Sequence, residues 1–581
     1  MGKVKTGKAF RVVLSIALAI FTLIWASLLT FLVAACLDDD GTQTGGGSKK
    51  TGVLDSIQLP DTVPQADGEF VQYEKFIKQA ENNQSNLEGI IVCPLYEVTV
   101  TTADGEKTPV YSYSVPMVQS EVHSFGYIDA TADTFPLTVT IKSIKAGYSL
   151  NDAVVIPEKL GVVPTVQNGT VTFTVESFDY YNVLFNGKFN FERPYTLYVR
   201  EYQELEVPKG YNLIEFKPGV HYVDYVSIPS NTMVYLHTGA LLIAKQPNIY
   251  EEGSTGVSHL GNRTWRAFFS WNKEGEKAEN IIIRGHGVID FSGLDLHART
   301  PFSFSSCTNL TIDGVTIVNS ISWTLHLKDC LNVNVRNVIL LGYRINSDGI
   351  AVCNCKNVLV ENCWLRTGDD MFEVKATDSG ASTTNTGGEN ITFRHCQAFA
   401  EKTRSFGFIQ ESQMPVSNIL FEDCSSLMQT ATWNEAMGAF NVIVGDSSTV
   451  SNVVFRNCDS YYALGYVLNV AVGFNQWTTN QNAGVADLGT IHDVTFENFK
   501  YYSHGAMPDG SEWKTRGIQI RNQGYDGFES IFGTEANLYN ITYRNVARDG
   551  VVLSQADLSN KEVFSIAGVY ENVVIEGAKT E

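Results

Sequence analysis

The sequence predicts an all-β protein in which a parallel β-helix follows a smaller β-sandwich-like module. From Val53 to about Glu206, short segments alternate apolar and polar residues, as half-exposed strands do. After about Tyr211, a short strand motif begins to repeat at intervals of 23 residues and upward, which is typical of stacked coils. The chain has 581 residues, enough for both parts.

The N-terminal segment has the pattern of an export signal. Basic residues precede an apolar run from Val12 to Ala35, which is followed directly by Cys36. The ending Leu32-Val33-Ala34-Ala35-Cys36 resembles the lipobox of bacterial lipoproteins, which implies a signal peptide over residues 1–36 and a lipid on Cys36. An uncleaved membrane anchor is the alternative, because the run is long enough to cross a bilayer. Either way, we expect most of the protein to lie outside the cytoplasm and to be tethered to the bacterial cell envelope. The lipid anchor implies the outer membrane or cell surface.

Three further segments follow this signal. Residues 37–52 are rich in Gly, Ser and Thr and are predicted to form a flexible tether. The β-sandwich-like module is assigned to residues 53–208, with one helical stretch expected near residues 74–81, and the β-helix to residues 209–581. Alternating strands of the module are expected at Tyr96–Val100, Leu137–Ile141 and Val171–Val175.

An asparagine followed by alternating apolar residues marks each predicted coil. The first gaps between these asparagines are 29, 23 and 25 residues, and later gaps of 28 to 47 residues indicate inserted loops. Because each coil stacks on the last, equivalent side chains should form ladders. The repeat positions are Asn280, Asn309, Asn332, Asn357, Asn390, Asn418, Asn452, Asn540 and Asn572, with a weaker copy at Asp493.

The cysteines of the predicted β-helix share this register. Four lie six residues after a repeat asparagine, and three lie two residues before one. Buried thiols in two stacked columns are the favoured interpretation, although an exported location would permit disulfides. The first column is Cys363, Cys396, Cys424 and Cys458, and the second is Cys307, Cys330 and Cys355.

The composition restricts the class of partner. The formal net charge of −21 argues against a nucleic-acid partner, whereas a neutral sugar suits an acidic enzyme. A strongly anionic polymer would need a local basic patch. We expect a monomer without a cofactor or a bound metal ion.

Three aspartates are the strongest functional signal. Asp348-Gly349-Ile350-Ala351-Val352 aligns with Asp370-Met371-Phe372-Glu373-Val374 at an offset of 22 residues, and Asp369 is adjacent. If 22 residues make one coil, Asp348 lies beside Asp370 at a strand spacing of about 4.8 Å. Carboxyls so close should couple their titrations and raise at least one pKa. Solvated turn acids are the alternative, but two such turns in register disfavour it.

Further residues are candidates for substrate binding. With Phe372 and Val374 inward, strand alternation turns Glu373 and Lys375 outward, and His326 has the Glu373 position one or two coils earlier. These side chains could bind sugar hydroxyls, or form part of a solvated sheet face. Lys375, Lys402, Arg404 and Arg521 are the cations that could hold an anionic sugar unit.

The stretch from about Ile281 to Lys375 resembles glycoside hydrolase family 28, the polygalacturonase family. The resemblance implies a right-handed parallel β-helix and cleavage of α-linked glycosidic bonds with inversion. It implies that Asp369 is the general acid and that Asp348 and Asp370 hold and activate water. The matching segments are Gly285–Asp290, Cys307–Ile312, Asn319–His326, Asn346–Ile350 and Gly368–Asp370.

The chain also departs from this family. The Gly-His-Gly segment that usually follows the acid pair is replaced by Arg404-Ser405-Phe406-Gly407-Phe408-Ile409-Gln410, and the family's carboxylate-gripping Arg-x-Lys pair is missing. Family 49, with dextranases and isopullulanases, is similar in its three aspartates, its lack of that histidine and its preceding β-sandwich.

We therefore expect an inverting glycoside hydrolase acting on a polysaccharide or oligosaccharide. A dextranase-like hydrolase of neutral glucans is one alternative. A β-helix polysaccharide lyase is another, which would need Ca²⁺ on the clustered acids and an Arg or Lys base, although the sequence places no arginine beside these acids. A glycan-binding surface protein without catalytic activity is the third.

Overall fold

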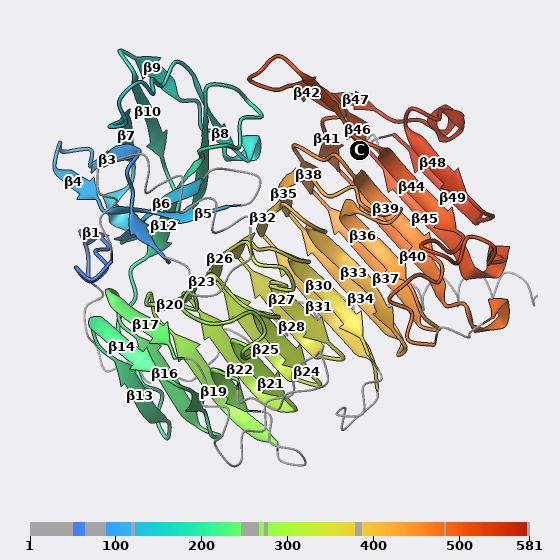
Figure 1. Cartoon of the computed structure of the whole chain (residues 1–581), viewed down its shortest axis with the longest axis horizontal. Helices are drawn as coiled ribbons and strands as arrows, with labels where there is room; N and C mark the ends of the chain where they lie inside the picture. The colour runs from blue at the N-terminus through green and yellow to red at the C-terminus, as the bar shows by residue number, and fades with distance from the viewer. Residues whose placement is uncertain are drawn as a thin grey trace, which may run out of the picture. The chain divides into compact units, whose positions relative to one another are not determined.

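The computed structural model describes residues 50–63, 89–117, 122–245, 267–271, 277–377, 386–480 and 484–577. In these ranges the chain consists of β-strands and a few short 3-10 turns (Figure 1), so the all-β prediction is confirmed. No helix within them is long and apolar enough to cross a membrane. The predicted signal peptide, Cys36, nearly all of the tether and the helical stretch near residues 74–81 lie outside the described residues.

The N-terminal module contains two antiparallel-rich sheets. The first has the order β2-β5-β6-β12-β11-β8, with β1 beside β6, and the second has the order β4-β3-β7-β10-β9. The three strands expected from alternation are the adjacent strands β3, β7 and β10. The bounds are β1 (Leu54–Ser56), β2 (Ile91–Val92), β3 (Tyr96–Thr101), β4 (Lys107–Val110), β5 (Ser112–Pro116), β6 (Val122–Ala130), β7 (Leu137–Ser143), β8 (Ala153–Ile156), β9 (Thr165–Gln167), β10 (Thr170–Val175), β11 (Asp179–Phe185) and β12 (Tyr195–Glu201).

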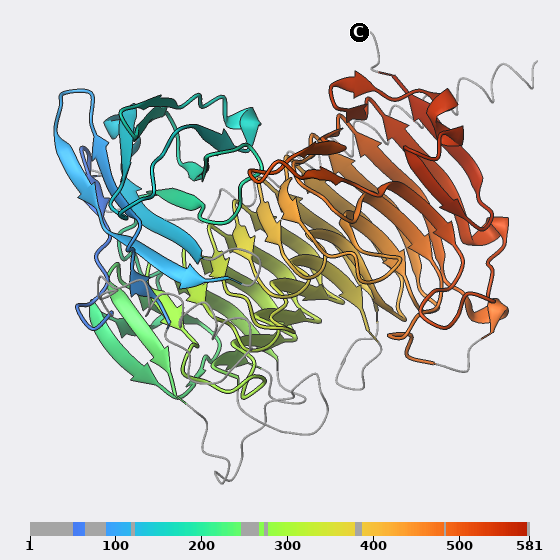
Figure 2. The same ribbon diagram turned by 45° about the horizontal axis from the view of Figure 1, so that its top comes forward.

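From residue 212 onward, three long sheets run along a parallel β-helix (Figures 1 and 2), and successive coils contribute strands to each sheet in turn. Sheet I contains β13 (Asn212–Phe216), β16 (Thr232–Leu236), β19 (Ala278–Arg284), β22 (Cys307–Asp313), β25 (Leu331–Arg336), β28 (Lys356–Glu361), β31 (Gly388–Arg394), β34 (Val416–Glu422), β37 (Thr449–Arg456), β40 (Thr490–Glu497), β45 (Leu538–Arg544) and β49 (Glu571–Glu576).

Sheet II contains β14 (Gly219–Val223), β17 (Ala240–Ala244), β20 (Val288–Asp290), β23 (Thr316–Val318), β26 (Ile339–Leu341), β29 (Trp364–Arg366), β32 (Gln397–Ala400), β35 (Ser425–Gln429), β38 (Asp459–Ser460), β41 (Lys500–Tyr501), β46 (Ala547–Arg548) and β47 (Val551–Val552). Sheet III contains β15 (Val226–Ser227), β18 (Phe269–Trp271), β21 (Phe302–Ser305), β24 (Leu325–Lys328), β27 (Ile350–Cys353), β30 (Phe372–Ala376), β33 (Phe406–Ser412), β36 (Gly438–Val444), β39 (Tyr466–Val472), β44 (Gly517–Asn522) and β48 (Phe564–Ala567). A small hairpin, β42 (His504–Ala506) and β43 (Glu512–Lys514), lies apart from these sheets.

The repeat asparagines explain how the coils keep their alignment. All ten predicted positions, Asp493 included, have φ between +51° and +59°, a left-handed conformation that asparagine and aspartate tolerate better than most residues. Each asparagine amide donates to the side-chain oxygen of the preceding coil, as between Asn357 and Asn332 at 3.1 Å and between Asn390 and Asn357 at 3.2 Å. Asn231, which the sequence repeat missed, accepts from Asn280 and begins the ladder.

The interior is filled by ladders of a second kind. Aromatic rings stack face to face at 4.7 to 5.2 Å, close to the strand spacing, in the column Phe393, Phe421, Phe455, Phe496 and Tyr543. The cysteines of both predicted columns are free and buried, so the prediction of stacked thiols is confirmed.

A shared hydrophobic core joins the module to the β-helix. It combines residues of the module's first sheet, such as Phe125 and Tyr198, with outward-facing residues of sheet II, such as Trp364 and Phe399. This core is separate from the one inside the β-helix and from the one between the module's two sheets.

The asparagine ladder leads to a test of stability. Asn357→Ala removes two amide hydrogen bonds and places alanine in a left-handed conformation, so we expect the free energy of unfolding to fall by about 2 to 3 kcal/mol. Asn357→Gly keeps the backbone conformation accessible and should cost about 1 kcal/mol. Urea unfolding followed by circular dichroism measures both variants. Equal losses would show that the left-handed conformation is not what selects asparagine here.

Candidate active site

The predicted acid-bearing coils are neighbours in sheet III. Ile350 pairs with Phe372 in the parallel register of β27 and β30, and the Gly349 N–H donates to the Asp370 carbonyl at 2.8 Å. Asp348 therefore stacks beside Asp370, one strand spacing of about 4.8 Å away. The same register places His326 two coils before Glu373, with Ala351 between them.

A tight turn between β29 and β30 presents Asp369 and Asp370. A Cβ atom on Gly368 would lie 1.9 Å from the Arg344 carbonyl oxygen, so no other residue fits there. The Gly368 N–H donates to Ser347 Oγ at 2.9 Å, and the Asn346 N–H donates to Asp369 Oδ2 at 3.1 Å. Asp348 and Asp370 are 3% and 4% exposed, whereas Asp369 keeps more of its surface accessible.

An arginine completes this column, contrary to the expectation that none lies beside the acids. Phe372 pairs with Phe406, so Arg404 occupies on the next coil the position that Asp370 has on its own. Its Nη1 lies 3.0 Å from Asp370 Oδ2, and its backbone N–H donates to Asp370 Oδ1 at 3.1 Å. A 34-residue coil separates Asp370 from Arg404, and the 22-residue offset of the preceding coil does not predict their proximity.

Glu373 and Lys375 turn outward from the interior as expected, but both are buried, at 0% and 2% exposure. Lys375 Nζ lies 3.1 Å from Glu373, 3.5 Å from Asp348 and 3.4 Å from Glu411, a residue that the sequence did not single out. It also lies 4.1 Å from the centre of the Trp323 ring, which contacts His326 edge to face. Lys375 thus connects the acid column to the neighbouring side chains of Trp323 and His326.

Burial and crowding change the proton affinity of these groups. Burial and the neighbouring Asp370 carboxylate raise the pKa of Asp369 to about 6. Burial, Asp369 and Glu373 raise the pKa of Asp348 well above its usual range, while burial raises the pKa of Glu373 to about 8. The surrounding carboxylates outweigh the cost of burial at Lys375 and hold its pKa well above its usual value. The column can therefore hold a protonated and an ionised carboxyl side by side near neutral pH.

One further polar residue approaches the acids. His297 Nε2 lies 3.2 Å from Asn346 Oδ1, and the Asn346 backbone binds Asp369. His297 lies in the connection between β20 and β21 and has φ of +61°. His297 belongs to none of the repeat motifs, and its left-handed backbone is visible only in the structure, so the sequence did not single it out. Among the described residues, no group of three or more His, Cys, Asp or Glu side chains is arranged to hold a metal ion.

Comparison with known sequences agrees with the architecture. Residues 264–508 match the family model described as glycosyl hydrolases family 28. Polygalacturonase QRT2 of Arabidopsis thaliana is 25% identical over 241 residues, covering 37% of this chain and 49% of that protein. A probable polygalacturonase of Vitis vinifera is 29% identical over 172 residues, covering 26% and 34% respectively. The chain thus spans at most about half the length of these curated relatives.

Among solved structures, Dex49A from Penicillium minioluteum is similar over 85% of this chain and 96% of its own, with a TM-score of 0.52 and 11% identity. This likeness supports the fold. The resemblance to glycosyl hydrolases family 28 expected from the acid-bearing coils is confirmed, since residues 264–508, which contain Asp348, Asp369, Asp370 and Arg404, match that family.

Proposed function

We propose that the protein is an inverting glycoside hydrolase that cleaves α-linked glycosidic bonds of a polysaccharide or oligosaccharide. The observation that carries this proposal is the stacked column of Asp348, Asp370 and Arg404 with Asp369 beside it. A hydrolase of this kind needs one carboxyl that gives a proton and another that activates water. The family match and the polygalacturonase relatives support the same class of reaction.

The proposed roles follow from the surroundings of each acid. Asp369, the most accessible of the three and with a pKa of about 6, is the general acid that protonates the leaving oxygen. Asp370, ion-paired with Arg404, is the carboxylate that takes a proton from water. Asp348, whose pKa is raised, carries a proton and positions this water by hydrogen bonding. Arg404, expected to bind substrate, is reassigned in this proposal to hold Asp370.

A lyase fits these groups less well. It would need a base, and the cations ion-paired with the acids are Arg404 and Lys375. Lys402, whose pKa burial lowers, interacts with Asp369 only through its charge. The Asp370 carboxylate raises the pKa of Arg404, and the carboxylates around Lys375 raise its pKa, so both stay protonated. A hydrolase needs neither cation to lose its proton.

The ion pairs of Lys375 and Arg404 also bear on which sugar the protein would cleave. Lys375 and Arg404 are buried and bound to carboxylates, so neither is presented to a sugar carboxylate. Because these two cations are already paired, the site favours a neutral sugar unit over an anionic one.

We expect dextran or another neutral α-glucan to be cleaved with a higher kcat/KM than polygalacturonate, as measured by reducing-end assays. Faster cleavage of polygalacturonate would contradict this preference without contradicting hydrolysis. It would indicate that Lys402, which interacts electrostatically with Asp369, binds the sugar carboxylate.

Asp369→Asn tests the general acid. The amide cannot donate a proton as an acid, so we expect kcat to fall at least about 100-fold on the best substrate of the panel while the circular dichroism spectrum is unchanged. In the unmodified protein, kcat/KM should decrease as pH rises above about 6, because Asp369 must be protonated to act. A variant with near-normal kcat would remove Asp369 from this role.

The stereochemical outcome tests the mechanism. With Asp370 acting on water rather than on the sugar, the first product should have the β configuration. Proton NMR during the first minutes of digestion, before mutarotation, distinguishes the anomers. An α product would mean retention and would exclude the proposed use of water.

A further inference from the structure

The N-terminal module contacts the β-helix directly behind the acid turn. Arg366, the last residue of β29, precedes Asp369 by three residues, and Glu401, which follows β32, precedes Arg404 by three residues. Arg366 Nε lies 2.8 Å from Glu401 Oε1. The same two neighbouring coils are thus joined twice, by Arg366 and Glu401 where sheet II ends and by Asp370 and Arg404 where sheet III begins.

The module takes part in the first of these joints. Arg366 Nη1 donates to Nδ1 of His123, on strand β6 of the module, at 2.7 Å. Because Nδ1 accepts this bond, Nε2 carries the proton and donates to Thr196 Oγ1 on β12 at 2.8 Å. His123 is fully buried, and both burial and Arg366 lower its pKa well below its usual value, so it stays neutral and keeps accepting.

A second module side chain bridges the same two coils. Asn182, on β11, accepts from Trp364 Nε1 at 2.8 Å and from Thr196 Oγ1 at 2.8 Å. Its own amide donates to Gln397 Oε1 at 2.6 Å. Trp364 is on the coil of Asp369, and Gln397 is on the coil of Arg404. All of these groups are nearly or fully buried, where a hydrogen bond is strong and its loss leaves an unpaired polar group.

We propose that the module positions the acid turn, with His123 and Asn182 holding the coils of Asp369 and Arg404 in the alignment that brings Arg404 onto Asp370. Arg366 is the connecting residue, since its side chain binds His123 and Glu401 while its backbone begins the turn Thr367-Gly368-Asp369. The role is one of positioning, because neither His123 nor Asn182 touches the acids in any contact described above. This inference rests on the proposed hydrolase function.

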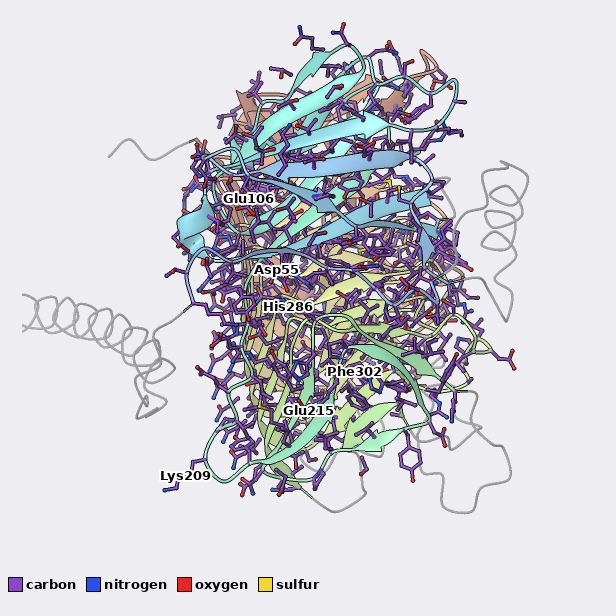
Figure 3. The ribbon with its side chains drawn as sticks, turned by 90° about the vertical axis from the view of Figure 1, so that its left-hand side faces the viewer. Asp55, Glu106, Lys209, Glu215, His286 and Phe302 are labelled. Atoms are coloured by element: carbon purple, nitrogen blue, oxygen red, sulfur yellow. The ribbon has the colours of Figure 1, made fainter. Side chains whose placement is uncertain are left out.

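The chain provides a matched control for this idea. His286, labelled in Figure 3, is a second buried imidazole at the contact between the module and the β-helix, and its Nδ1 lies 2.7 Å from Asp129 on the same strand β6. It lies two residues before β20, which is three coils before β29. His123→Leu and His286→Leu therefore remove comparable interdomain hydrogen bonds, one behind the acid turn and one away from it.

The experiment compares kcat, KM and the pH profile of both variants on the best polysaccharide of the panel, with the unfolding midpoint of each. We expect both midpoints to fall, but only His123→Leu should lower kcat, by about tenfold or more, with KM changed less than threefold. Loosening this alignment moves Arg404 away from Asp370 and leaves more of the Asp370 charge acting on the adjacent Asp369, so the alkaline limb of kcat/KM should move to higher pH in this variant alone. His123→Asn, which keeps an acceptor near Nδ1, should recover part of kcat.

Three outcomes would overturn the proposal: equal kcat losses in the two variants, an unchanged kcat in folded His123→Leu, or a lower kcat with an unmoved pH limb. If His123→Leu does not fold, Glu401→Gln applies the same test from the β-helix side, because it weakens the bond to Arg366 without changing the module. Failure of the hydrolase proposal is distinguishable, since the unmodified protein would then cleave no polysaccharide.

Discussion

The parallel hydrogen bonding of one coil to the next is the constraint on which the rest of this structure depends. It sets a repeat of about 4.8 Å along the β-helix, and every side-chain column adopts that repeat. The stacked rings from Phe393 to Tyr543, the thiol columns and the asparagine ladder are all consequences. Asp348, Asp370 and Arg404 form a further column of this kind, one made of charged side chains at equivalent positions of successive coils.

At the acid column this spacing holds carboxyl groups close together in a buried site, where water cannot stabilise their charges. Carboxyls one strand spacing apart in a buried site cannot all be ionised, so protons are retained on some of them near neutral pH. Arg404 and Lys375 offset the remaining charge from two sides, one bound to Asp370 and the other to Asp348, Glu373 and Glu411. A site crowded with carboxyls thereby holds protonated and ionised carboxyls next to two buried cations.

The sequence predicted those parts of the site in which coil length is regular. The 22-residue offset predicted that Asp348 lies beside Asp370, and strand alternation predicted that Glu373 and Lys375 turn outward. It did not predict Arg404 or Glu411 as partners, because a 34-residue coil hides their register. Nor did it predict that Glu373 and Lys375 are buried, since burial of an outward face depends on segments distant in the sequence. His297 was missed because it lies in a connection between strands, where neither strand alternation nor the asparagine repeat applies.

The asparagine ladder has a consequence for how this fold can diversify. Coils between Asn280 and Asn572 differ in length by a factor of two, from 23 to 47 residues, yet the amide contacts along the ladder stay between 2.7 and 3.2 Å. Extra chain is therefore accommodated away from the ladder without moving one coil against its neighbour. Insertions between strands can therefore change the surface of this scaffold repeatedly while the stacked columns, the acid column among them, keep their alignment.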